Sequence, residues 1–385
     1  MKAHSTLRFF FNRTVWILLL IGALSLLTSC VPTPQESLIA TPAMLADAKA
    51  VFQRPESILF AGGPFQDSII YQVNPDGSEQ VCRSCGDYRV GFNSPAWAPD
   101  GSAIAYSITS PWGNGIQVVL DEYRFTFIYS DDDLYDNPVW SPDGRQIAFD
   151  YRRHIETYGP SLPTYGHSQI FIAPYRGVQI EIADAHNLYF NAWDLSDPDW
   201  SPDGQQLVFT CNIYTDGIEQ NDICIWAVNG LNQANLTQTP NEFEYSPKWS
   251  PDGRKIVYTR GDDIWVMNTD GSDQINLTGG SLGYNMSPAW SPDGSQIVFV
   301  TTRTTEGECG YGCLCTELYI MNADGSNPHN VTNNPKTCVI DPDWGPRRPR
   351  RNTQAWVIGG AIVTVLAVGF ALWVIVWKSR RAISR

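Results

Sequence analysis

Three groups of residues carry side chains that could do chemistry. The first, Gly279-Gly280-Ser281-Leu282-Gly283, matches the Gly-x-Ser-x-Gly pattern of a nucleophilic serine. That pattern works only on a strand-to-helix turn that exposes the hydroxyl beside a base and oxyanion donors. Here it follows the strand-like Ile275-Asn276-Leu277-Thr278 and leads into a loop. We therefore interpret Ser281 as a loop residue and expect no catalytic serine.

Carboxylates and histidines form the second group. Four aspartates lie close together in one stretch: Asp131, Asp132, Asp133 and Asp136. They could bind Ca²⁺, which takes several oxygen ligands, although a solvated acidic loop has the same sequence. Three of the five histidines follow: His154, His167 and His186. They lack the close spacing of a metal motif, so a site formed by them depends on the fold.

Aromatic residues form the third group, in irregular stretches around the same histidines. They are Tyr151, Tyr158, Tyr165, Tyr189, Phe190 and Trp193. Aromatic side chains on loops are typical of protein or glycan contacts, but they can also pack beneath their own loops. We predict that they form a binding surface together with His154 and His167.

A short repeat must position these residues. Trp-Ser-Pro-Asp-Gly, with alanine for serine in the first copy, begins at Trp97, Trp140, Trp200, Trp249 and Trp290, and a degenerate copy begins at Trp344. Each full copy runs into alternating apolar residues, as in Lys255-Ile256-Val257-Tyr258. A tryptophan signature with a period of about 40–50 residues indicates one four-stranded propeller blade per repeat.

The two ends of the repeat region predict how the ring closes. Three strand-like segments precede the first tryptophan, at Ser57–Phe60, Ser68–Val73 and Ser78–Arg83. One more, Asp341–Trp344, follows the fifth full repeat. One strand plus three make a sixth blade, and a closed ring leaves no exposed sheet edge. We predict an all-β, six-bladed β-propeller with 1+3 strand closure over residues 57–346.

The repeat resembles that of a known family. Trp-Ser-Pro-Asp-Gly-x-x-Ile-x-Phe, followed by Asn-x-Asp-Gly-Ser and Leu-Thr, is similar to the WD-like propeller repeat of the TolB family, which prolyl-oligopeptidase-type enzymes also use. The resemblance covers roughly Ser57 to Trp344 and implies the fold, because the shared residues are structural. This chain differs from TolB in lacking a separate N-terminal α/β domain and in carrying an apolar C-terminal segment. Related propeller lyases use histidines near the channel.

The direction of the strands separates two faces of the ring. If the four strands of a blade are named a to d from the centre outward, the a–b and c–d turns share one face, here called the turn face. The b–c and d–a loops share the other, here called the loop face. The long irregular stretches, among them 151–167 and 185–196, fall on the loop face. Function in such scaffolds lies on loops, so we predict that the loop face binds.

Both chain ends carry targeting features. Residues 1–30 read as a signal segment, with Lys2, Arg8 and Arg13 before the apolar Val15–Leu27. Leu27-Thr28-Ser29-Cys30 resembles a bacterial lipobox, which implies a lipid on Cys30; an ordinary signal peptide is the alternative. Residues 31–56 are rich in proline and alanine, which predicts a linker.

The C-terminal segment is long enough to span a membrane. Residues 355–377 are uncharged and mostly apolar, between a basic juxtamembrane segment at 347–354 and a basic tail at 378–385. If the N-terminal signal starts translocation, this helix stops it. We therefore predict a single-pass protein of the cell membrane, with the propeller outside the cytoplasm and the tail inside.

Charge excludes one class of partner. All 40 acidic residues of the chain lie between Val31 and Pro346, whereas many of the 26 basic residues lie outside that segment. Such a negative field repels nucleic acid and favours cationic partners.

Eight of the nine cysteines lie in the predicted propeller. They are Cys82, Cys85, Cys211, Cys224, Cys309, Cys313, Cys315 and Cys338. An even number in an exported domain favours disulfides. We predict that Cys211 pairs with Cys224 and that the Cys-x-x-Cys at 82–85 is a local disulfide. Cys338 is expected to pair with a cysteine of the 309–315 cluster, and a zinc site built from these four is the alternative.

These features together favour a binding protein over an enzyme. We expect a non-catalytic, extracytoplasmic propeller scaffold of the bacterial cell envelope that binds a protein or an envelope glycan through its loop face, with no cofactor unless calcium binds. The alternative is a propeller-type lyase or hydrolase with a metal- or histidine-containing site on the same face.

Overall fold

The structure is a computed structural model that describes most of the predicted propeller. The described residues are 56–63, 68–84, 91–120, 123–155, 164–187, 192, 194–215, 218–230, 232–239, 241–281, 283–303, 315–333 and 338–346. The predicted signal segment with Cys30, the linker, the juxtamembrane segment, the transmembrane helix and the tail lie outside them. Among the described residues, no helix has the length and hydropathy needed to cross a membrane.

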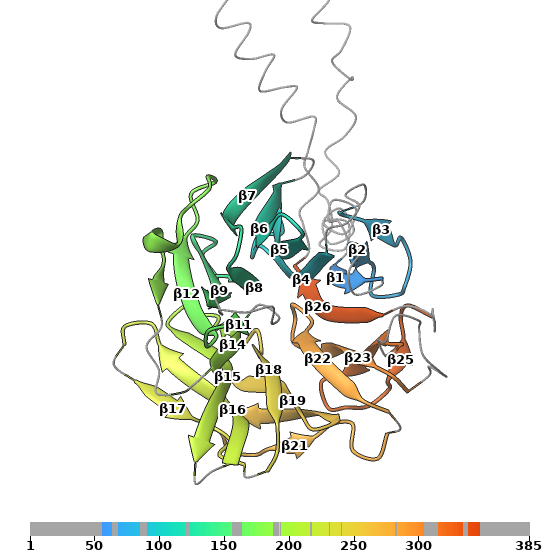
Figure 1. Cartoon of the computed structure of the whole chain (residues 1–385). Helices are drawn as coiled ribbons and strands as arrows, with labels where there is room; N and C mark the ends of the chain where they lie inside the picture. The colour runs from blue at the N-terminus through green and yellow to red at the C-terminus, as the bar shows by residue number, and fades with distance from the viewer. Residues whose placement is uncertain are drawn as a thin grey trace, which may run out of the picture. The chain divides into compact units, whose positions relative to one another are not determined.

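The described strands form six four-stranded antiparallel sheets around a central axis (Figure 1). Blade 1 contains β26 (Val339–Gly345), β1 (Ser57–Gly62), β2 (Ile69–Val73) and β3 (Val81–Cys82). Blade 2 contains β4 (Gly91–Trp97), β5 (Ala103–Ser110), β6 (Gly113–Leu120) and β7 (Tyr123–Ser130). Blade 3 contains β8 (Leu134–Trp140), β9 (Gln146–Arg152), β12 (Gln169–Pro174) and β13 (His186–Asn187).

The other three blades follow in chain order. Blade 4 contains β14 (Asp194–Trp200), β15 (Gln206–Thr215), β16 (Ile218–Ala227) and β17 (Gln233–Asn235). Blade 5 contains β18 (Glu244–Trp249), β19 (Lys255–Arg260), β20 (Asp263–Asn268) and β21 (Ile275–Asn276). Blade 6 contains β22 (Asn285–Trp290), β23 (Gln296–Thr301), β24 (Glu317–Asn322) and β25 (His329–Asn330). Blade 3 adds a small hairpin of β10 (His154–Ile155) and β11 (Thr164–Tyr165), and a 3₁₀ turn at Ile182–Asp184.

The ring closes as predicted, through strands from both ends of the repeat region. β26 pairs with β1 in the register Ile58 to Trp344 and Gly62 to Val339. The backbone N–H of Trp97 in blade 2 donates to Oδ2 of Asp343 in β26, at 2.7 Å. The closing strand is therefore tied both to its own blade and to the next one.

The Ser-Pro-Asp-Gly turns explain why the repeat recurs. In the second copy the Ser141 hydroxyl donates to Asp143 at 2.7 Å and accepts from the backbone of Gln146 at 2.9 Å. The Gly144 N–H donates to the Ser141 carbonyl at 2.8 Å, and Gly144 takes a φ of 68°, which glycine adopts without strain. Each motif thus closes its own a–b turn on the turn face.

The core lies between neighbouring blades, where the repeat tryptophans are buried. Trp290 packs with Val257 of blade 5 and with Ile297 and Phe299 of blade 6. Trp344 packs with Ile58 of β1 and Val298 of blade 6. Each tryptophan therefore joins two sheets, and the buried residues of the described blades form six clusters, each between two neighbouring blades.

Candidate functional site

The loop face of blade 3 contains a wide pocket of about 1430 Å³, here called the blade-3 pocket. Residues selected from the sequence line it, among them Asp132, Asp133, Tyr151, His154, His167 and His186. The fold brings them together because the d–a loop after β7, the excursion between β9 and β12, and β13 all open at the same end of this blade.

Asp133 holds two sides of this pocket together. Its carboxylate accepts hydrogen bonds from the Tyr151 hydroxyl at 3.1 Å and from the His154 backbone N–H at 2.9 Å. Burial, with the charge of Asp133, raises the pKa of Tyr151 to about 12, so the phenol stays a neutral donor. The Tyr151 ring also meets Phe171 edge to face at 5.1 Å. Tyr151 is therefore part of the pocket's foundation as well as its lining.

The other predicted binding residues differ in their places. His167 is exposed, with Nδ1 at 3.6 Å from Oδ1 of Asp194, and His186 is exposed on β13. Tyr165 pairs through its backbone with His154 in the β10–β11 hairpin. Four predicted residues lie outside the described part of the chain: Tyr158, Tyr189, Phe190 and Trp193.

The four aspartates proposed for calcium are divided between two places. Asp133 faces the blade-3 pocket, whereas the Asp136 carboxylate accepts from the hydroxyls of Ser94 and Ser107 near the ring axis, at 3.0 and 2.6 Å. Asp131 and Asp132 are exposed. Among the described residues no group of three or more His, Cys, Asp or Glu side chains is gathered to hold a metal ion. Calcium binding by these residues stays a prediction.

A second candidate site, the central channel, was not predicted from the sequence. Its signal lies three residues before each tryptophan, where a serine, asparagine or aspartate precedes a proline: Ser94, Asn137, Asp197, Ser246, Ser287 and Asp341. Each takes a φ between 47° and 54° at a register shift of its innermost strand. Such bulges bend a strand and re-aim its side chains, and they accommodate proline. All six of these residues line a cavity of about 280 Å³ on the ring axis.

One cation and several carboxylates meet in this channel. The Lys248 Nζ lies 3.7 Å from Oδ1 of Asp199, whose Oδ2 accepts from the Trp249 N–H at 2.8 Å. Burial alone would lower the pKa of the Lys248 ammonium, but Asp199, Asp343 and other channel carboxylates outweigh it and raise that pKa. Lys248 therefore stays charged.

A shared amide joins Asp197 of the channel wall to the buried Asp150. The Asn137 side-chain N–H₂ donates to Asp150 at 2.7 Å and to Asp197 at 2.9 Å. Burial, followed by the charge of Asp197, raises the pKa of Asp150 well above its usual value. Burial and the neighbouring negative charge both disfavour the ionised form of the Asp150 carboxyl group.

The channel predicts a stability that falls with rising pH. Burial, with Asp136 and Asp197, raises the pKa of Asp341 to about 7, and burial raises that of Asp199 to about 6. A carboxyl whose pKa is raised by folding stabilises the fold while protonated, and this contribution is lost as the pH rises through the folded-state pKa. Wild-type protein should therefore unfold at a higher temperature at about pH 6 than at about pH 8.

Asp341→Asn should be more stable than wild type at about pH 8, by about 1–3 kcal/mol, because one pKa unit corresponds to about 1.4 kcal/mol and the neighbouring carboxyls share the titration. Asparagine also tolerates the left-handed φ of this position. Thermal unfolding of the full-length chain between about pH 6 and pH 8 measures both effects. Asp132→Asn on the exposed loop is the control; an Asp341→Asn curve parallel to wild type would contradict the assignment.

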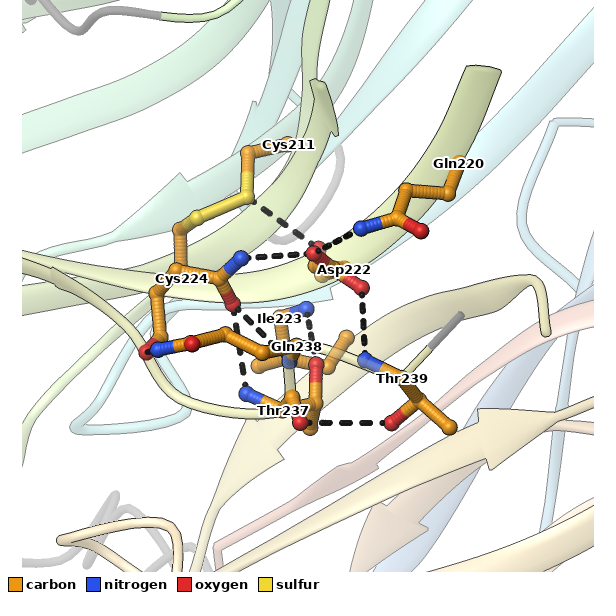
Figure 2. The surroundings of a disulfide bond; sticks show 9 residues. Cys211, Gln220, Asp222, Ile223, Cys224, Thr237, Gln238 and Thr239 are labelled. Atoms are coloured by element: carbon orange, nitrogen blue, oxygen red, sulfur yellow. Dashed lines mark hydrogen bonds between the residues drawn. A yellow bond between two sulfur atoms is a disulfide. The ribbon is translucent and has the colours of Figure 1, made fainter. Parts of the chain in front are cut away.

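One disulfide of the propeller is seen directly (Figure 2). Cys211 in β15 and Cys224 in β16 are bonded, with Cα atoms 5.8 Å apart, as predicted. Cys82, Cys315 and Cys338 are also disulfide-bonded, so Cys315 and Cys338 are not free thiolates for the alternative zinc site. Cys85, Cys309 and Cys313 lie outside the described residues.

Comparisons with known proteins agree with this architecture. The sequence model of the TolB beta propeller domain matches residues 166–310 and 198–347. The crystal structure of TolB from Acinetobacter baumannii is similar at a TM-score of 0.59 and 19% identity, over 82% of this chain and 74% of that chain. Hydrazine synthase of Kuenenia stuttgartiensis gives a TM-score of 0.60 at 13% identity, over 82% of this chain and 50% of that chain. No curated protein matches the sequence.

Likeness at these identities shows the fold and leaves the ligand open. The repeat motif, the closed ring of six blades and the matched residues point to the same group of propellers. Residues 166–347 of this chain match the TolB beta propeller domain, and the described strands form a six-bladed propeller.

Proposed function

We propose that this chain is a non-catalytic binding protein of the bacterial cell envelope, held in the membrane with its propeller outside the cytoplasm, and that it recognises a partner protein through its loop face. The observation that carries the proposal is the blade-3 pocket, where histidines, carboxylates and aromatic residues from separate loops line one surface of about 1430 Å³. An envelope glycan is the competing ligand.

The composition of this pocket favours a protein over a small substrate. Asp132 and Arg153 present charges of both signs around a wide opening, with Tyr151 and Phe171 packed beneath. Mixed charges around aromatic anchors are typical of protein interfaces.

The serine motif supports a non-catalytic role. Ser281 closes a turn through its backbone N–H, which donates to the Thr278 carbonyl at 2.9 Å. Its hydroxyl accepts from the Asn285 amide at 3.0 Å, and an amide cannot serve as the base that a serine nucleophile needs.

Export is supported by two independent features. The Cys211–Cys224 disulfide is typical of an oxidising compartment outside the cytoplasm. The N-terminal residues 1–30 have the charge and hydropathy of a signal segment.

Chemical crosslinking in cells, followed by purification of the full-length chain from membranes, tests the proposal. The double variant His167→Ala/His186→Ala should lower recovery of the crosslinked partner about tenfold, the effect of losing about 1.4 kcal/mol of binding. Arg145→Ala/Arg254→Ala, which removes two exposed side chains of the turn face, is the matched control and should leave recovery unchanged.

The chemistry of the adduct separates the two ligand classes. A protease-sensitive adduct supports a protein partner, whereas an adduct released by a muramidase identifies an envelope glycan and overturns the choice of protein. Equal losses in both double variants would contradict binding through the blade-3 pocket.

A further inference from the structure

Two exposed aromatic rings lie side by side where blade 5 begins. Phe243 and Tyr245 are 47% and 36% exposed, and their ring centroids are 6.4 Å apart with planes only 5° from parallel. They are two residues apart in an extended segment, so both side chains leave the same side of the backbone. Glu244 between them points the other way and is fully buried.

Glu244 fixes this aromatic pair from below. Its Oε1 accepts from Arg260 Nε at 2.6 Å and from the Thr239 hydroxyl at 3.1 Å. The Arg260 guanidinium also lies over the Trp265 ring, 4.5 Å from its centroid. The rings are thus held in place by a buried ion pair. The positive charge of Arg260 is neutralised by Glu244 inside the blade.

The disulfide hairpin of blade 4 supports the pair from the side. Asn221 of β16 forms a β-bridge with Phe243. The next residue, Asp222, accepts from the Thr239 N–H at 3.4 Å and from Asn235 at 2.5 Å, directly beside the Cys211–Cys224 bond (Figure 2). A surface ordered in this way loses little conformational entropy when it binds.

A third aromatic ring and two carboxylates extend the surface into blade 6. The Gly261 N–H donates to the Phe243 carbonyl at 3.0 Å, and the Asn285 N–H donates to the Asp262 carbonyl at 2.9 Å. The turn between β19 and β20 therefore lies between Phe243 and Tyr284, which is 48% exposed. Glu242 and Asp262 are both exposed, and the Glu242 carboxylate lies beside Gly261 of this turn.

The local charge of this surface is negative. Besides Arg260, a second arginine in the described part of this region, Arg303, stacks on Phe299 and Tyr319 and donates to Asn285 at 2.8 Å. Both guanidinium groups thus engage aromatic rings and polar atoms of their own blades. Glu242 and Asp262 face solvent beside uncharged rings, and the acidic channel lies close enough for Asp197 to raise the pKa of Tyr245, after the larger effect of burial.

We propose that this acidic aromatic rim, formed by Glu242, Phe243, Tyr245, Asp262 and Tyr284, binds a basic segment of a protein partner. Lysine or arginine side chains lie with their stems along Phe243 and Tyr245, and their charges meet Glu242 and Asp262. Cations are attracted to aromatic faces, and their aliphatic stems cover apolar surface. The inference rests on the proposed protein-binding function but concerns a surface apart from the blade-3 pocket.

Charge complementarity decides between a basic peptide and a glycan. Parallel rings alone would suit the flat face of a sugar as well as a guanidinium group. The exposed carboxylates favour the cation, and they repel an acidic glycan.

Peptide binding to the full-length chain tests the proposal. The probe is a fluorescent synthetic peptide of alternating glycine and arginine; a glycine–glutamate peptide of equal length and a chitin hexasaccharide are the comparison probes. We expect only the arginine peptide to bind, more weakly at higher salt. Phe243→Ala/Tyr245→Ala should weaken binding about tenfold, and Glu242→Gln/Asp262→Asn by a similar factor.

Two further variants make the result specific. Phe243→Leu keeps an apolar side chain but removes the aromatic face, and it should also weaken binding several-fold. Ile275→Ala/Asp270→Asn removes one exposed apolar and one exposed acidic side chain elsewhere in blade 5, and it should change nothing. A loss in this control equal to that in the rim variants, or binding of the chitin probe in place of the peptide, would overturn the proposal.

The two binding proposals fail separately. His167→Ala/His186→Ala should still bind the arginine peptide, because the rim is intact. If every rim variant still binds the arginine peptide, the rim proposal is wrong. The crosslinking test of the blade-3 pocket is not affected by that result.

Discussion

Replacing Lys248 by methionine is expected to lower the free energy of unfolding by about 1–3 kcal/mol at about pH 7.5, less than for a fully buried ion pair because the Lys248 side chain is 30% exposed. The Lys248 Nζ lies 3.7 Å from Asp199, and Asp343, Asp197 and Asp341 also act on its charge. Removing one partner of this half-buried ion pair leaves the other charge without compensation, which costs more than the pair contributed. Chemical denaturation of the full-length chain measures the loss.

Two comparisons separate this electrostatic cause from lost packing. Adding Asp199→Asn to Lys248→Met should restore part of the stability, because one uncompensated carboxylate is then neutral. The loss should also shrink at about pH 5, where Asp199 and Asp341, with pKa values of about 6 and about 7, carry protons. A loss of the same size at both pH values, with no effect of Asp199→Asn, would point to packing.

Trp344→Ala is expected to lower the free energy of unfolding by about 3–5 kcal/mol and to open the ring at one seam. The first effect is that of removing a large buried side chain; Trp344 is 6% exposed and packs across blades 1 and 6. The second arises because β26 is held to its blade by pairing with β1 rather than by a hairpin turn.

Trp290→Ala provides the matched control, since it removes the same side chain from a blade whose strands follow one another in the chain. Hydrogen exchange should accelerate in β1 (Ser57–Gly62) for Trp344→Ala and stay slow there for Trp290→Ala. Slow exchange in β1 for both variants would show that closure does not depend on Trp344.

The fold could be predicted because its determinants are local. Ser141, Asp143 and Gly144 form a turn with partners at most five residues away, so five copies of one motif mark five blades. The closing strand could be predicted because the strands at both ends add up to one blade. Cys211 and Cys224 could be paired because they flank one hairpin.

The channel could not be predicted in the same way. The polar residue before proline, as at Asp197 and Asp341, recurs in the sequence, but the left-handed φ values that aim these side chains appear only in the bulged pairing. Their pKa shifts come from carboxylates of other blades, such as the effect of Asp136 on Asp341. Ring closure creates these contacts between blades, so the sequence pattern of a single strand does not predict them.

The binding surfaces could be predicted from the sequence less well than the fold but better than the channel. His154, His167 and His186 line one pocket because all belong to the irregular segments of one blade, which the repeat period already located. The run of aspartates separates because Asp136 enters β8 and turns toward the axis while Asp133 remains in the loop. Phe243 and Tyr245 lie in a short, regular connection without the length that drew attention to other loops.

The central claim is that a partner engages the loop face while the repeated turns only build the ring. Placing one photo-crosslinking residue at position 186 of the loop face, or at position 203 of the turn face, tests it in living cells most directly. A discrete protein adduct from position 186 and none from position 203 is the expected result. The same adduct from both positions, or an adduct from position 203 alone, would contradict the claim.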